Sequence, residues 1–73
     1  MNLEKIAKKG AFLIIIGDSI VGLRRDYESA IENAIDTYGN NGTTFSVRRE
    51  EMSTEDYRTM KLRLKEGKIK IRR

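Results

Sequence analysis

The stretch that decides the fold is residues 11–24, AFLIIIGDSIVGLR. The apolar, largely β-branched run at 11–16 is too short for a helix and is typical of a buried strand. Gly17 and Asp18 then place glycine first in a two-residue connection, as a type II′ hairpin turn requires. Residues 19–24 fit the returning strand, in which Gly22 would accommodate a bulge or close packing. This stretch therefore predicts a β-hairpin.

The segment after the hairpin, residues 27–38, carries apolar side chains at spacings of three and four. Such spacing forms one stripe along a helix, and acidic residues fill the other side. Asp26 is a suitable N-cap for this helix, and Gly39 is expected to end it in the left-handed conformation. Residues 2–9 predict a further short helix at the N-terminus.

The last third of the chain contains a strand, a helix and a final segment that fits two structures. Residues 43–49 alternate between apolar and polar side chains, which predicts a strand with one wet face. Ser53 is a suitable cap for a helix over 54–66, which is expected to be followed by a short strand at 68–72. The alternation from residue 60 to residue 71 also fits a hairpin, but the Met, Lys, Leu, Arg and Glu content favours the helix.

These elements predict one α+β domain over residues 1–73, in the order α-β-β-α-β-α-β. The expected sheet is small and mainly antiparallel, with the helices packed on one face. Because strand 11–16 is apolar on both faces, its second face must be covered by helix 2–9, by another copy of the chain or by a partner protein. Leu13 and Ile15 are therefore candidate interface residues, and a homodimer is one expected arrangement.

The residue types that are missing exclude several classes of site. The chain has no cysteine and no histidine, which removes disulfides, thiolate nucleophiles, histidine bases and Cys/His zinc sites. The acidic pairs at 50–51 and 55–56 do not follow the spacing of a calcium-binding EF-hand loop. We therefore expect no catalytic residue, no metal site and no cofactor, and we interpret the protein as not an enzyme.

One motif points the other way. Residues 14–22, IIIGDSIVG, resemble the first block of the GDSL-type esterases. The resemblance implies that Ser19 is a nucleophile, activated in that family by a histidine paired with an aspartate near the C-terminus. The chain has no histidine to accept the serine proton, and it is too short for the layered α/β fold of that family. Turn chemistry at Gly17 and Asp18 explains the same residues.

The charge of the chain is unevenly distributed. The net charge is +4, but residues 61–73 hold seven basic residues against Glu66 alone, a net charge of +6 that leaves −2 for residues 1–60. A basic terminus favours an anionic partner, either nucleic acid or an acidic protein surface. If the last strand pairs beside 43–49, basic side chains from both strands project from one sheet face. The candidate nucleic-acid-binding residues are Arg48, Arg49, Lys61, Arg63, Lys65, Lys68, Lys70, Arg72 and Arg73.

The favoured interpretation is a small, non-enzymatic binding or regulatory protein that contacts nucleic acid through its basic C-terminal segment. The alternative is a protein–protein interaction module, such as a small inhibitor, adaptor or accessory subunit. Residues 11–16 are far too few to span a membrane, so no membrane partner and a cytoplasmic location are expected. Binding to nucleic acid should weaken steeply as salt rises, which separates the two interpretations.

Overall fold

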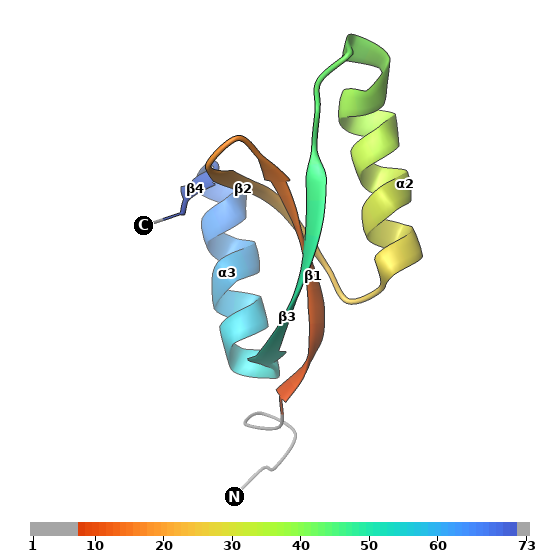
Figure 1. Ribbon diagram of the computed structural model, residues 1–73. Helices are drawn as coiled ribbons and strands as arrows, with labels where there is room; N and C mark the ends of the chain where they lie inside the picture. The colour runs from red at the N-terminus through yellow and green to blue at the C-terminus, as the bar shows by residue number, and fades with distance from the viewer. Residues whose placement is uncertain (1–7, 72–73) are drawn as a thin grey trace, which may run out of the picture.

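A computed structural model describes residues 8–71 (Figure 1). Its helices and strands are β1 (Lys8–Ile16), β2 (Ser19–Arg24), α2 (Tyr27–Tyr38), the 3-10 turn η1 (Gly39–Asn41), β3 (Ser46–Ser53), α3 (Thr54–Glu66) and β4 (Ile69–Lys70). The strands form one antiparallel sheet in the order β3-β1-β2-β4. The predicted α+β class with a small antiparallel sheet is confirmed. Among residues 8–71, no helix is long and apolar enough to cross a bilayer.

The hairpin of β1 and β2 is as predicted. Gly17 has a φ of 61°, while Asp18 is not among the residues with positive φ, as expected when glycine is first in a type II′ turn. The β1–β2 register shifts between Ile14 and Ile15, so β2 carries one extra residue there. A Cβ at Gly22 would lie 2.9 Å from Cδ1 of the buried Ile14, so glycine is needed beside the bulge.

The two helices lie on opposite faces of the sheet (Figure 1), and the prediction that they share one face is wrong. Ala11, Leu13 and Ile15 of β1 pack with side chains of α3, whereas Ile14 packs with Ala30 and Ala34 of α2. The physical reason is that β1 is apolar on both sides. One helix on each face therefore covers both sets of side chains within a single chain.

Helix α2 has the predicted bounds and N-cap, but its predicted C-cap is wrong. The Asp26 carboxylate accepts a hydrogen bond of 2.9 Å from the backbone N–H of Ser29. Gly39 has helical backbone angles, because the chain continues into η1 before it turns. Gly42, with a φ of 70°, is the residue in the left-handed conformation.

The C-terminal third confirms the helix and corrects the strands. Ser53 caps α3 by accepting from the Asp56 N–H, and the helix has the predicted bounds, which excludes the alternative hairpin. Strand β3 begins at Ser46 instead of 43 and runs on through Ser53 because all its residues pair with β1.

The last strand is shorter than predicted and lies on the other side of the sheet. Strand β4 spans only Ile69–Lys70 and pairs with β2, so it does not lie beside β3. The helix predicted over 2–9 falls mostly outside the described residues, and its last two residues belong to β1.

Candidate nucleic-acid interface

Three hollows lie along α3, and neighbouring hollows share side chains. Tyr57 and Arg58 line both the first and the second hollow, and Lys61 and Lys65 line both the second and the third. We call these three hollows together the basic groove. Glu55 lines an adjoining hollow that shares Arg58 with the first two. The ionisable side chains that line the three hollows of the groove, apart from the tyrosine, are all cationic. They are Lys9, Arg24, Arg25, Arg49, Arg58, Lys61 and Lys65.

The groove begins in its largest hollow, of about 700 Å³, beside the first residues of β1 and α3. Strand β2 pairs with β1 only as far as Arg24, opposite Phe12, so the start of β1 has no strand on this side within residues 8–71. The side chain of Arg25 reaches over this part of the sheet, donating from one guanidinium nitrogen to the carbonyls of Lys9 and Gly10 at 3.2 and 3.3 Å and to that of Met52 on β3 at 3.5 Å. These bonds fix a cation at the floor of the hollow.

Tyr57 joins the first hollow to the second. The guanidinium of Arg25 lies 4.2 Å from the centre of the Tyr57 ring, and the ammonium of Lys61 lies 5.8 Å from it. Both distances are within the range of a cation–π interaction. The Tyr57 hydroxyl also donates to the carbonyl of Leu23 at 3.4 Å. Tyr57 therefore ties α3 to β2 and holds two cations of the groove in place.

Farther along α3, three cations converge where the groove runs beside β2. Burial of Lys61, followed by the positive charges of Arg24 and Lys65, lowers the pKa of Lys61 below its ordinary value of 10.5. Lys61 and Lys65 are four residues apart on one helix, a spacing at which like charges repel. A bound anion would relieve this repulsion, so the cluster favours a negatively charged ligand.

Most of these cations are free to meet such a ligand. Within residues 8–71 the ion pairs are Arg48 with Glu50 and Arg49 with Glu51, both on β3. The remaining cations of the groove have no carboxylate within ion-pair distance among those residues. The exposed acids Glu28, Glu32 and Asp36 lie on α2, on the other face of the sheet. Helix α2 therefore carries acidic charges alone, whereas α3 carries four basic side chains against Glu55, Asp56 and Glu66.

The structure does not bring the predicted nucleic-acid-binding residues into one patch. Lys61, Lys65 and Arg49 line the basic groove. Arg48 is on β3, at the opposite edge of the sheet from β4, so the predicted stripe of Arg48 beside the residues of the last strand does not exist. Arg72 and Arg73 lie outside the described residues.

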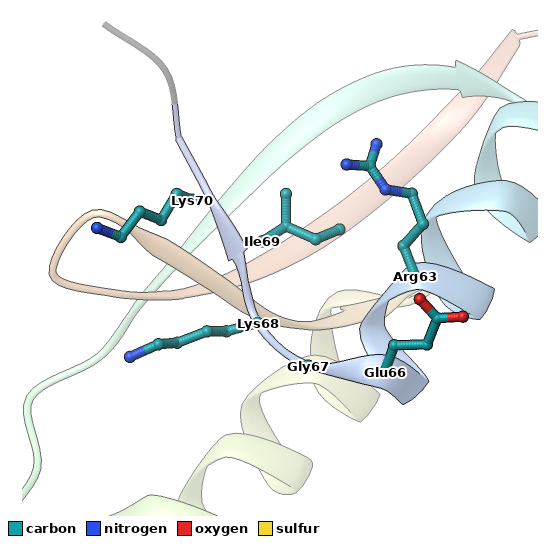
Figure 2. Close-up of a pocket in the computed structure, with 6 residues that line it drawn as sticks. All are labelled: Arg63, Glu66, Gly67, Lys68, Ile69 and Lys70. Atoms are coloured by element: carbon teal, nitrogen blue, oxygen red, sulfur yellow. The ribbon is translucent and has the colours of Figure 1, made fainter.

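Three further predicted residues lie in a separate hollow of about 390 Å³ at the end of α3. Figure 2 shows Lys68 and Lys70 extending to the same side of the chain, away from Arg63. Glu66 also lines this hollow, so its charge is mixed. It is a second basic surface, less uniformly charged than the groove.

The two predicted interface residues are inside the chain's own core. Leu13 is 1% exposed and Ile15 is 8% exposed, because α3 covers the face of β1 from which they project. Leu13 and Ile15 were expected at an interface because a face of strand 11–16 needed a cover. Since α3 of the same chain provides that cover, their apolar character no longer argues for a partner.

Lys9, Arg24, Arg25 and Arg58 were not among the predicted site residues, although they contribute much of the groove. They are scattered over three elements, and only the pairing of β1 with β2 and the docking of α3 bring them together. The doublet at Arg24 and Arg25, at the end of a strand, was the one local signal in the sequence.

Ser19, the residue implied by the esterase resemblance, is 5% exposed at the start of β2. Its hydroxyl donates to the side chain of Asp18 at 3.5 Å, within the hairpin turn. Residues 8–71 contain no cluster of carboxylates that could hold a metal ion. Comparisons of the chain with protein-family models, with curated proteins and with solved structures found no match.

Proposed function

We propose that the protein is a small, non-enzymatic nucleic-acid-binding protein whose basic groove contacts the phosphate backbone. The observation that carries the proposal is the convergence of cations from β1, β2, β3 and α3 on a groove that no described carboxylate lines. The repulsion around Lys61 supports it, because phosphate would neutralise charges that are held together at a cost. A cytoplasmic location is part of the same proposal.

The groove has dimensions that suit a short stretch of backbone. Helix α3 has 13 residues and is therefore about 20 Å long, which matches about six base steps of a duplex. One face of the Tyr57 ring is covered by Arg25, so the ring supports cations instead of offering a free surface for a base. Contacts of this kind position a protein on nucleic acid without reading its sequence.

The expected binding is strongly salt-dependent. Lys9, Arg24, Arg58, Lys61 and Lys65 are the groove cations whose side chains neither pair with a carboxylate nor bind backbone within residues 8–71. If each neutralises one phosphate of a duplex, the slope of log K against log salt is about −4.5. Affinity should then fall by roughly 500-fold between about 50 and about 200 mM salt.

The test is fluorescence anisotropy with a labelled oligonucleotide over this range of salt, using two triple variants that each lose three positive charges. The groove variant is Arg58→Gln, Lys61→Gln and Lys65→Gln. The control variant, at the other hollow, is Arg63→Gln, Lys68→Gln and Lys70→Gln. In the groove variant, the slope of log K against log salt should be smaller in magnitude by about three than in the wild type. The control variant should keep most of the wild-type slope. No binding by the wild type at low salt would refute the function, and equal losses in both variants would refute the site.

The alternative function, a protein–protein interaction module, has a separate structural basis. It rests on the outer edge of β3, the edge away from β1; of the β3 residues only Arg49 lines the basic groove. A specific occupant for that edge can be derived from its charges.

A further inference from the structure

Within residues 8–71, strand β3 leaves the backbone groups along its outer edge without a partner strand. It pairs with β1 from Ser46, opposite Ile15, to Ser53, opposite Lys8. On its other side, no strand from residues 8–71 lies beside it. An unpaired edge of this length is a template for another strand, whereas β4 at the opposite edge has only two residues.

The side chains of β3 divide their charges evenly between the two faces. Arg48 and Glu50 pair with Leu13 and Ala11 of β1, whose side chains belong to the core beneath α3. Successive side chains of a strand point to opposite faces, so Arg49 and Glu51, which follow Arg48 and Glu50 in the chain, project on the face that α2 covers. Each face of the strand thus carries one arginine and one glutamate, and each pair forms an ion pair within the chain.

This pattern is self-complementary when two copies of β3 pair antiparallel. A two-fold axis perpendicular to the sheet keeps each face on its own side, so only positions of the same face can be opposite each other. With Arg49 on the axis, Arg48 of each copy lies opposite Glu50 of the other. Two cross-strand ion pairs then form on the α3 face. On the α2 face the two Arg49 residues are opposite each other, but each guanidinium lies over Gly10 of its own β1 and pairs with Glu51 of its own chain, so the two cations turn away from the axis.

An exposed apolar side chain lies on the same side of the molecule. Asn33 of α2 faces the hollow beside β2. Ile31 and Ile35 are each two residues from Asn33 and so lie roughly on the opposite flank of the helix, toward β3. Ile35 is 49% exposed there. Pairing at the β3 edge would bring the two Ile35 flanks toward each other and shelter them.

We propose that β3 pairs with β3 of a second copy, which joins two four-stranded sheets into one continuous sheet of a homodimer. The symmetry puts both α3 helices on one face and both α2 helices on the other. One face of the dimer therefore carries both α3 helices with their cations, and the other carries both acidic α2 helices. This inference goes beyond the proposed function and does not depend on it, because Arg48 and Glu50, which form the cross-strand pairs, do not line the basic groove, and the guanidinium of Arg49, which does, lies over β1.

The test is sedimentation equilibrium of the full chain without nucleic acid, up to high micromolar concentration. The expected species is twice the 8.4 kDa chain. Two single variants, Arg48→Glu and Glu50→Arg, each place like charges opposite each other at two positions. Each should weaken self-association about thirtyfold. Both side chains are exposed, at 54% and 40%, so circular dichroism should show the native fold in both variants.

Mixing the two variants is the decisive step. In a mixed dimer the two glutamates of the Arg48→Glu chain would lie opposite the two arginines of the Glu50→Arg chain, so the mixture should dimerise where neither variant does alone. Arg49→Cys gives the register, because the chain has no other cysteine and a residue on the axis should form a disulfide with its own copy. A monomeric wild type would overturn the proposal. A dimer that both single variants leave intact, or a mixture that stays monomeric, would overturn it as well.

Discussion

Replacing Lys61 by methionine should make the fold more stable while weakening binding. Lys61 carries a positive charge close to Arg24 and Lys65, and burial together with these charges lowers its pKa. The Lys61–Lys65 repulsion alone is expected to cost about 0.2–0.5 kcal/mol. Methionine keeps the length and the helix propensity of lysine. It loses the cation–π contact of Lys61 with the Tyr57 ring, but its thioether can replace that contact with a sulfur–aromatic contact of similar size, so the net change is set by the lost repulsion. For a chain of this size the gain corresponds to a rise in Tm of about 1–4 °C.

The assay is thermal unfolding followed by circular dichroism at low and high salt, with Arg63→Met as the control on the same helix. Arg63 lies outside the groove, three residues before Glu66, so its loss should not stabilise the fold. The gain of Lys61→Met should shrink at high salt, where the repulsion is screened. A wild type that is more stable than Lys61→Met at low salt would refute the reasoning about the cluster.

The pH dependence of the same pair of proteins follows from the lowered pKa. Between the folded pKa of Lys61 and its ordinary value of 10.5, the unfolded chain binds more protons than the folded chain. The free energy of unfolding of the wild type therefore rises with pH in this window, because deprotonation removes the unfavourable charge on Lys61. The stability advantage of Lys61→Met over the wild type should shrink accordingly. A difference between the two proteins that stays constant up to pH 10.5 would contradict the assignment.

Three further predictions concern the fold. Leu13→Ala should lower the free energy of unfolding by about 2–5 kcal/mol in chemical denaturation, because the side chain is 1% exposed beneath α3; a loss below about 1 kcal/mol would place Leu13 outside the core. Gly22→Ala should cost about 1–3 kcal/mol, since its Cβ would lie 2.9 Å from Ile14, whereas Gly10→Ala meets only the flexible end of Arg49 and should cost much less; equal effects on Tm would argue against the close packing at the bulge. Ser53→Ala should cost about 1 kcal/mol by removing the N-cap of α3, and an unchanged Tm would show that the cap contributes nothing.

The local parts of the fold were predictable because single short segments determine them. Glycine first in the turn at 17–18, Asp26 before α2 and Ser53 before α3 each specify a backbone conformation through contacts within a few residues. The bounds of α2 and α3 followed from these caps and from the apolar spacing. The left-handed residue was misplaced because η1 extends the helical path by one turn, which no side-chain pattern signals.

The arrangement of these elements was less predictable. The apolar character of both faces of strand 11–16 was visible in the sequence, but which helix covers which face depends on long-range packing. Strand β3 runs through Arg49, Glu50 and Glu51, residues that resemble a loop in composition yet pair fully with β1. The position of β4 beside β2 depends on only two paired residues.

The same limits explain the site. Lys61 and Lys65, which the excess of charge at residues 61–73 indicated, line the groove, but helix and strand geometry separates the segment into two hollows. Lys9, Arg25 and Arg58 join the groove through the end of β2 and the docking of α3, which are tertiary features.

The most direct test of the central claim is a residue-by-residue map of where a short oligonucleotide binds. The isotopically labelled full chain would be titrated with the oligonucleotide at low salt, and backbone amide shifts would be followed by nuclear magnetic resonance. The expected changes lie along α3 from Thr54 to Lys65 and at Lys9, Arg24 and Arg25, and they should reverse as salt is added. Changes confined to Gly67–Lys70, or to α2, would contradict the groove as the binding site.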